Sequence, residues 1–353
     1  MSNSVPTAVL GATGYVGGEL LRLISQHPEL HFAAAVSNSY AGRSIASVFS
    51  HLASAYRDTK FVAHDDWIEN VDTGSDLALF SAAPHGASAN LIRAALAAAA
   101  SKDLNVHVVD SSADFRYREP IDYRTVYGVD HGAPDLLSSF HCGVPEHVSD
   151  TTAPHIGHPG CFATAVLLAA VPLLSSGFVE GDLFVSGVTG STGSGRKPQE
   201  GTHHPERHSN MYAYKPLEHR HAPEIMALAK QALGIDTIVN FVPHSGPFAR
   251  GIYVTVQAKA ASGTSSDALR TTFVEAYRDA PFIDVVDGTP RLKSVIASNR
   301  CQIGIATSPN AIVITSAIDN LVKGAAGGAV QWMNRLWGFP ETSGLLAPAT
   351  AWT

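Results

Sequence analysis

The sequence predicts an α/β protein of two domains: a parallel sheet with helices on its faces, then an α+β domain on a mixed or antiparallel sheet. Three observations carry this prediction. Short apolar runs alternate with helical patterns up to about residue 155, as in strand–helix–strand units. Beyond that point β-rich runs outnumber the helices. A glycine-rich turn joins the first strand to the first helix.

The expected elements follow from periodicity and from flanking turn residues. In the first domain we expect strands at 8–10, 32–36, 77–81 and 106–109, and helices at 19–26 and 87–100. In the second we expect strands at 183–188, 238–242, 251–258 and 311–316, and helices at 161–174, 224–232 and 266–278. The tail, 320–336, is helical and is expected to pack back on the first domain. The predicted domains are therefore 1–157 with 320–353, and 158–319.

Composition excludes several classes of function. The chain of 353 residues has 24 Lys and Arg against 31 Asp and Glu, a net charge of −7, which disfavours a nucleic-acid groove or an anionic membrane surface. Apolar runs stay well short of the ~18 residues of a membrane span. The polar start, 1–7, does not resemble a signal peptide. The 3 cysteines form no framework, which is typical of a reducing compartment, so we predict a cytoplasmic protein.

The turn Gly11-Ala12-Thr13-Gly14-Tyr15-Val16-Gly17 follows a strand and opens a helix. In that context Gly11 permits the tight turn, Gly14 lets the backbone approach a pyrophosphate, and Gly17 allows close helix–sheet packing. The free N–H groups of the helix start then face the phosphates. The alternative is an ordinary glycine turn. The strand and helix around it favour a Rossmann domain that binds a dinucleotide, with Thr13, Tyr15 and Val16 beside the cofactor.

The end of the second strand indicates which dinucleotide is bound. NAD enzymes usually place Asp or Glu there, whereas this chain has Ser37 and Ser39, followed by Arg43. Hydroxyls and a cation suit a 2′-phosphate, so NADP(H) is favoured over the alternative of loop residues that only face solvent. Pro84 and His85 follow the third strand, where a loop would border the cofactor. A turn without a ligand is the alternative there.

Cys161 lies in His158-Pro159-Gly160-Cys161-Phe162, where an apolar helix begins directly at the cysteine. Unsatisfied N–H groups and the helix dipole at such a position favour thiolate, the attacking species. The alternative is a small buried hydrophobic residue, which is the interpretation we prefer for Cys142 and Cys301. A thiolate beside a nicotinamide attacks an activated carbonyl, and hydride then reduces the thioester to an aldehyde. An acyl phosphate is a suitable donor because phosphate leaves readily.

Four further side chains suit this chemistry. His219 and His221 precede a helix, and a histidine exchanges protons near neutrality. Spacing does not choose between them, and structural capping is the alternative for both. Arg116 and Arg250 are candidates for binding substrate carboxylate or phosphate, because the planar guanidinium holds two oxygens. The alternative for each arginine is an ion pair.

The segment His203-His204-Pro205-Glu206-Arg207-His208 invites a metal hypothesis. It has neither a His-Glu-x-x-His helix nor cysteine ligands beside it, so we predict no metal and expect this loop to contact substrate or cofactor.

Together these motifs resemble the N-acetyl-gamma-glutamyl-phosphate reductases, within the aspartate-semialdehyde dehydrogenase superfamily. The resemblance covers 11–23, 112–116, 159–164, 191–196, 219–225, 243–251, 317–331 and 338–342. It implies an NADPH-dependent reductive dephosphorylation of N-acetyl-gamma-glutamyl phosphate to N-acetylglutamate 5-semialdehyde, in arginine biosynthesis. It also implies a homodimer or homotetramer that associates through the second domain's sheet.

The resemblance implies roles for individual residues. Cys161 would be the nucleophile and His219 the acid/base, supported by Glu224. His221 and Arg116 would lie at the substrate. The loop with Ser191 and Gly193, together with Asn320, would approach the nicotinamide.

This chain departs from the family in two places. The family usually has Asn before Pro-Gly-Cys, whereas this chain has His158. The segment from His203 to Arg207, followed by Tyr214-Lys215-Pro216, resembles the sister reductases of lysine biosynthesis. Those enzymes act on an aminoadipyl phosphate attached to a small acidic carrier protein. Because a mildly acidic chain is a poor docking surface for such a carrier, the arginine pathway is preferred and the carrier-linked substrate is the alternative.

Two other classes share some of these features. A short-chain dehydrogenase needs a Tyr-x-x-x-Lys motif well downstream, and the match at Tyr56 and Lys60 comes too early. A non-catalytic NADPH sensor would share the glycine turn and would tolerate the loss of Cys161.

Overall fold

The computed structural model describes residues 4–352. The chain forms two compact units. The first comprises the chain up to Cys142, Thr151–His158 and Ala325–Leu346. The second comprises Gly143–Asp150, Pro159–Gly324 and the chain from Ala347 onward. The short segment before Thr151 therefore belongs to the second unit, although it is flanked by the first.

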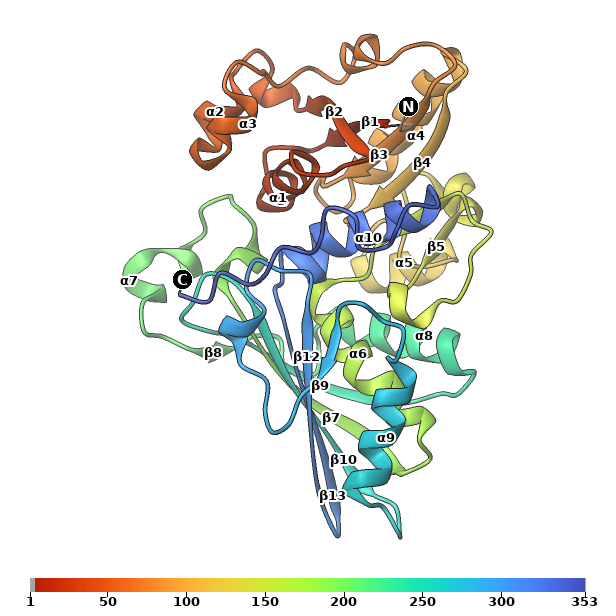
Figure 1. Ribbon diagram of the computed structural model, residues 1–353, viewed down its shortest axis with the longest axis vertical. Helices are drawn as coiled ribbons and strands as arrows, with labels where there is room; N and C mark the ends of the chain where they lie inside the picture. Colours follow the sequence, from red (N-terminus) through yellow and green to blue (C-terminus); the bar gives the residue numbers. More distant parts are fainter. Residues whose placement is uncertain (1–3, 353) are drawn as a thin grey trace. The chain divides into compact units, whose positions relative to one another are not determined.

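The first unit is built on a six-stranded sheet in the order β2-β1-β3-β4-β6-β5 (Figure 1). All its pairings are parallel. Its strands are β1 Val5–Leu10, β2 Leu30–Val36, β3 Asp76–Ser81, β4 Asn105–Asp110, β5 Phe140–Cys142 and β6 His155–Gly157. Its α-helices are α1 Tyr15–Ile24, α2 Ile45–Val48, α3 Ala53–Tyr56, α4 Ser88–Ser101, α5 Pro120–Tyr127 and α10 Gly327–Leu336.

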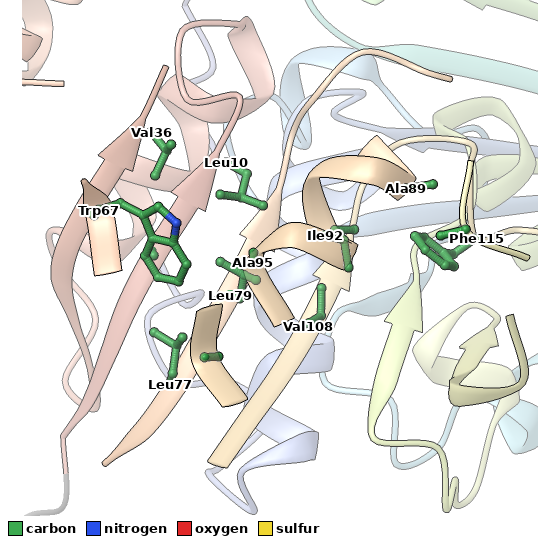
Figure 2. Packing of buried hydrophobic residues seen from close by; sticks show 14 of the residues in the cluster. Leu10, Val36, Trp67, Leu77, Leu79, Ala89, Ile92, Ala95, Val108 and Phe115 are labelled. Carbon is green, nitrogen blue, oxygen red and sulfur yellow. The ribbon is translucent and has the colours of Figure 1, made fainter. Parts of the chain in front are cut away.

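One face of this sheet carries a continuous apolar core. Leu10, Val36, Leu79 and Val108 point from strands β1 to β4 toward α4 and Trp67, and all five side chains are buried (Figure 2). Helix α10 contacts β4 and α1 within the same unit, so the C-terminal helix belongs to the first sheet. This core fixes the carboxyl ends of the parallel strands, where ligands bind in such folds.

The second unit is built on a seven-stranded sheet in the order β11-β12-β13-β10-β7-β9-β8. Its strands are β7 Val179–Thr189, β8 Tyr212–Ala213, β9 Val239–Ser245, β10 Ile252–Ala260, β11 Ile283–Val285, β12 Cys301–Ser308 and β13 Ala311–Ile318. Strands β7 and β9, and β11 and β12, pair parallel, and the others pair antiparallel. The predicted fold class, a parallel-sheet domain with a mixed-sheet α+β domain, is confirmed.

Helices α6 Cys161–Ser175, α8 His221–Leu233 and α9 Ser266–Ala276 cover one face of this sheet, and α7 His204–Arg207 lies in the long loop before β8 (Figure 1). Helix α6 is buried along almost its whole length, between α8, α9 and strands β10 and β13. The opposite face includes exposed residues such as Phe184. Helix α6 is therefore a rigid core element, and its first residue is Cys161.

Candidate active site

Cys161 occupies the first position of α6, as its Pro-Gly-Cys context predicts. Gly160 is the N-cap and has no side chain to cap the helix, while the Thr164 N–H closes the first turn on the Gly160 carbonyl at 2.8 Å. Cys161 is half-buried, whereas Cys142 and Cys301 are buried. Burial raises the pKa of the Cys301 thiol to about 12, which keeps it protonated. Only Cys161 combines partial exposure with the positive end of a helix, which favours thiolate.

Two residues of α8 hold the backbone just before the nucleophile. The Glu224 carboxylate is fully buried and accepts a hydrogen bond from the Gly160 N–H at 2.6 Å. A Cβ atom on Gly160 would lie 2.3 Å from Nε2 of His221, so that ring packs directly on the glycine backbone. The resemblance implied that Glu224 supports a histidine, and the structure adds this contact to the Gly160 backbone.

His219 lies in an aromatic cluster beside the nucleophile's helix. Its ring centroid is 4.7 Å from that of His221 and 6.1 Å from that of Phe162, which follows Cys161. Its Nδ1 accepts the His221 backbone N–H at 3.2 Å. Burial, with Arg220 and Lys215 adding repulsion, lowers the His219 pKa to about 4. The ring is therefore neutral at pH 7, and since Nδ1 accepts a hydrogen bond, its proton lies on Nε2.

Tyr214 joins this cluster, although sequence reasoning did not single it out as a site residue. Its ring centroid is 5.5 Å from that of His219, and its N–H donates to the carbonyl of Pro243, in β9, at 3.0 Å. Burial raises the pKa of the Tyr214 hydroxyl, and the negative charge of Cys161 raises it further. The hydroxyl therefore stays protonated next to the nucleophile. Its position seven residues before His221 was a weak signal, because local sequence patterns do not show that its segment pairs with β9.

The predicted anion-binding arginines have different surroundings. Arg116, in the first unit, is buried, and its guanidinium donates to the carbonyls of His158 at 3.0 Å and Ser111 at 3.4 Å. Arg250, in the second unit, makes a bidentate pair with the buried Asp319 carboxylate at 3.0 and 3.2 Å. Because the Arg250 fork already holds a carboxylate, the ion-pair alternative is favoured for this residue.

The glycine turn has the shape that a dinucleotide requires. Gly11 has φ +67°, and a Cβ there would lie 2.6 Å from the backbone of Ala83. A Cβ on Gly17 would lie 2.6 Å from the Ala12 backbone, whereas one on Gly14 would point into open space. Helix α1 starts at Tyr15 without a side-chain cap. Its first N–H groups are thus left for an external anion, with no side chain at Gly14 to exclude it.

The residues predicted around the cofactor lie on loops that follow the strands of the same unit. Ser37 is buried with its hydroxyl 3.4 Å from that of the exposed Ser39, and the exposed Arg43 guanidinium lies 4.8 Å from the Tyr40 ring centroid. Val36, the last residue of β2, is thus followed by hydroxyls and a cation and by no carboxylate up to Arg43, which suits a 2′-phosphate.

The loop after β3 is tied to the segment that leads to Arg116. The Ala113 N–H bonds Nδ1 of His85 at 2.9 Å, and the Gly86 N–H bonds the Asp114 carboxylate at 2.7 Å. Pro84 and His85 are exposed, whereas Asp114 is buried. A loop held in this way and open to solvent fits the predicted edge of a cofactor site. Thr13 and Val16, in the glycine turn, are partly exposed in the same unit.

The loop predicted to approach the nicotinamide is held by Asn320. The Asn320 side-chain amide donates to the Thr192 hydroxyl at 3.1 Å and accepts the Gly251 N–H at 2.7 Å. The Ser191 N–H bonds the Phe248 carbonyl at 2.9 Å. A Cβ on Gly193 would lie 4.0 Å from the same amide. The structure thus brings Ser191, Gly193 and Asn320 together in the second unit, and their approach to the nicotinamide stays a prediction.

The histidine-rich loop shows no metal centre. Within residues 4–352 no group of three or more His, Cys, Asp and Glu side chains could hold an ion. His203, His204 and His208 are exposed, while Arg207 is buried and donates to the Asn210 carbonyl at 3.0 Å.

Comparison with known proteins identifies the family. The model of the semialdehyde dehydrogenase NAD-binding domain matches residues 6–151, and that of the semialdehyde dehydrogenase dimerisation domain matches residues 161–320. An N-acetyl-gamma-glutamyl-phosphate reductase from Methanopyrus kandleri is 40% identical, with 98% of each chain covered. Another, from Rhodospirillum rubrum, is 38% identical with the same coverage. The chain belongs to the N-acetyl-gamma-glutamyl-phosphate reductase family.

Solved structures agree on the fold. The aspartate semialdehyde dehydrogenase II of Vibrio cholerae, complexed with ASA, aligns with a TM-score of 0.68 at 17% identity, covering 96% of this chain and 99% of that one. The Candida albicans enzyme, solved with NADP, aligns with a TM-score of 0.65 at 15% identity, covering 95% and 99%. The predicted family and the prediction of a dinucleotide-dependent oxidoreductase are confirmed. Among residues 4–352, no helix of the reductase is both long and apolar enough to cross a membrane.

Proposed function

We propose that this reductase converts N-acetyl-gamma-glutamyl phosphate to N-acetylglutamate 5-semialdehyde with NADPH, through a thioester on Cys161, in arginine biosynthesis. The observation that carries the proposal is a partly exposed cysteine, Cys161, at the first position of a buried helix. Its relatives at 34–40% identity are named for this reaction. The glycine turn and the serines after β2 suit the cofactor.

NADPH is held by the first unit in this proposal. Gly11, Gly14 and the start of α1 face its pyrophosphate. Ser37, Ser39 and Arg43 bind the 2′-phosphate. The absence of a carboxylate between Val36 and Arg43 supports this preference for NADPH over NADH. When bound, NADPH supplies the hydride that reduces the thioester. Ser191, Gly193 and Asn320 position the loop that borders the nicotinamide.

The residues of the second unit carry the covalent steps. The Cys161 thiolate attacks the acyl carbon, a C–S bond forms, and phosphate leaves with the electron pair of the broken C–O bond. After reduction, the tetrahedral oxyanion collapses, the C–S bond breaks, and its electrons return to sulfur as the aldehyde is released. Neither step requires a proton from the enzyme, so a neutral His219 contributes as a donor at Nε2 to the developing oxyanion.

Tyr214 and Glu224 prepare the nucleophile for these steps. The protonated Tyr214 hydroxyl stabilises the neighbouring thiolate by donating to it or to the water around it. Glu224 holds the Gly160 N–H and so fixes the turn at which α6 begins. Arg116 and His221 are assigned to the substrate's anionic groups. Arg250 is left to its ion pair with Asp319.

A carrier-linked aminoadipyl phosphate is the second candidate substrate. The observation that favours it is the loop from His203 to Arg207, whose sequence resembles the same segment of the lysine-pathway reductases. Two of its side chains, His203 and His204, are exposed. A small acidic carrier protein would then be a partner. We place it second because the relatives found are named for the glutamyl substrate and the net charge of −7 opposes an acidic partner.

Two assays test the proposal. Phosphate-dependent oxidation of N-acetylglutamate semialdehyde should fall by roughly 10³-fold or more in Cys161→Ser, since a nucleophile is lost, while Cys142→Ser keeps it. Retained turnover in Cys161→Ser would exclude the thioester mechanism. A wild-type protein that binds NADPH but turns over no acyl phosphate would instead be a non-catalytic NADPH sensor. A higher kcat/KM with carrier-linked aminoadipate semialdehyde than with N-acetylglutamate semialdehyde would reverse the order of the two substrates.

We also propose that the enzyme is a homodimer or homotetramer in the cytoplasm. The match to a dimerisation domain over residues 161–320 supports an oligomer, and the exposed face of the seven-stranded sheet offers the surface. None of the 3 cysteines, including the reactive Cys161, forms a disulfide, which suits a reducing compartment.

A further inference from the structure

The turn that follows β13 forms part of the wall around the nucleophile. A Cβ atom on Gly324 would lie 2.8 Å from the Cβ of Cys161 and 3.1 Å from its Cα. The backbone of this turn therefore touches Cys161 directly, at a distance that only glycine allows. Any shift of the turn would move either the thiol or the start of α6.

The turn has unusual backbone geometry and is held at its beginning by Asp319. Val322–Ala326 is a single π-helical turn, a rare form that is often found at functional sites. The Asp319 carboxylate accepts the N–H groups of Leu321 at 2.8 Å and Val322 at 3.1 Å. The Asp319 carbonyl accepts the Gly324 N–H at 3.0 Å. These bonds fix the backbone at the start of the turn. They do not involve the side chain of Lys323, which lies in the middle of the turn.

The side chain of Lys323 holds the middle of the turn through a buried ion pair with Glu146. Its Nζ lies 2.5 Å from the Glu146 carboxylate, and the two side chains are 0% and 1% exposed. Glu146 comes from the short segment that joins the second unit from outside its main run. The Lys323 ammonium also lies 5.7 Å from the Phe282 ring centroid. The side chain of Lys323, in the middle of the turn, is thus fixed by the Glu146 carboxylate.

A buried ion pair by itself contributes little to the free energy of unfolding. Removing two charges from water costs free energy that their attraction only offsets, and apolar replacements of similar volume are often no less stable. A buried pair does select one backbone arrangement, because any other leaves two charges unpaired. Here the selected arrangement is the one that places Gly324 against Cys161.

We propose that the Lys323–Glu146 ion pair is a positioning device for Cys161, which sets the thiol's place and reactivity by fixing the π-helical turn behind it. Neither residue touches the substrate in this proposal. The inference rests on the proposed role of Cys161 as the nucleophile, but not on which acyl phosphate the enzyme reduces.

The test removes both charges at once, in Lys323→Met with Glu146→Gln. Single variants would leave an unpaired buried charge and could fail to fold, so the double variant is the informative one. We expect its kcat to fall by about 10- to 100-fold, as for a small misplacement of a reacting group, with the NADPH Kd unchanged. We also expect slower alkylation of Cys161 by iodoacetamide, with an altered pH profile, followed by mass spectrometry of the Cys161 peptide.

Three comparisons make the result decisive. Lys323→Arg keeps the charge and should retain more of the alkylation rate than the neutral double variant. Arg300→Gln with Asp284→Asn removes another ion pair of the same unit, at 2.8 Å, and should leave the rate unchanged. A folded double variant with wild-type kcat and a wild-type alkylation profile would overturn the proposal. Alkylation needs no substrate, so it still reports on Cys161 if neither acyl phosphate is turned over.

Discussion

At the scale of single residues, the orientation of His219 depends on one backbone hydrogen bond. Its Nδ1 accepts the N–H of His221, and protonation of that nitrogen would break the bond. Burial lowers the pKa of His219 from 6.5 to about 4, with Arg220 and Lys215 opposing the charge further. The ring therefore carries one proton, on Nε2, throughout the physiological range.

We expect His219 to stay neutral between about pH 5 and 8, where an ordinary histidine titrates. Its pKa is 6.5 unfolded and about 4 folded, so its contribution to stability is complete above pH 6.5 and is lost as pH falls toward 4. The Cε1–H resonance in NMR spectra, assigned by its loss in His219→Gln, checks this expectation. An inflection near pH 6.5 in the folded enzyme would contradict it.

Gly160 gives a second prediction at this scale. Its φ of −63° and ψ of 152° suit any residue, so Gly160→Ala introduces no backbone strain. The new methyl group would lie 2.3 Å from Nε2 of His221 and must displace that ring. We expect kcat to fall by about 10²-fold with the NADPH Kd unchanged. In a double-mutant cycle, His221→Ala should remove most of the stability cost of Gly160→Ala, and additive effects would exclude the steric cause.

The sequence could predict some of these residues and not others, for a physical reason. Cys161 was predictable because a helix start is a local property, set by Pro-Gly before an apolar run. The pairing of Arg250 with Asp319 joins residues 69 positions apart, and Lys323 meets Glu146 over 177 positions. Contacts of that kind depend on strand order and on packing, which local patterns do not encode.

At the scale of elements, the helix after the glycine turn shows how packing overrides local propensity. We expected it from residue 19, but α1 begins at Tyr15. Gly17 and Gly18 are poor helix formers, yet both are buried in α1, and Gly17 packs on the Ala12 backbone. Strand β12 was also missed, because its hairpin partner β13 has the stronger apolar pattern.

The two glycines of that turn give a matched pair of predictions. Gly17→Ala places a methyl group 2.6 Å from the Ala12 backbone, so α1 must move, and we expect a loss of about 1–3 kcal/mol of stability together with weaker NADPH binding. Gly14→Ala meets open space, so Tm should change little while the methyl group obstructs the pyrophosphate. Thermal unfolding and NADPH titration separate the two. Unchanged NADPH affinity in Gly14→Ala would place the pyrophosphate elsewhere.

At the scale of the whole molecule, the chain passes between the two units several times. Gly143–Asp150 belongs to the second unit and Thr151–His158 to the first, and Ala325–Leu346 returns to the first sheet. The sequence indicated the change of character near residue 155 and the returning tail. It did not indicate the excursion at Gly143–Asp150, which has no periodicity and brings Glu146 into the second unit's core.

The exposed face of the seven-stranded sheet gives the last prediction. Phe184 is 58% exposed and lies opposite Gln257, which lies opposite Val313, so the three side chains share one face across neighbouring strands. Burying a large apolar side chain is worth about 1.5–3 kcal/mol, and a twofold interface buries it twice. We therefore expect Phe184→Lys to lower the molar mass measured by light scattering. Ile121→Lys, at a residue of the first unit that is 64% exposed, is the control. An unchanged mass in Phe184→Lys would exclude this face as the interface.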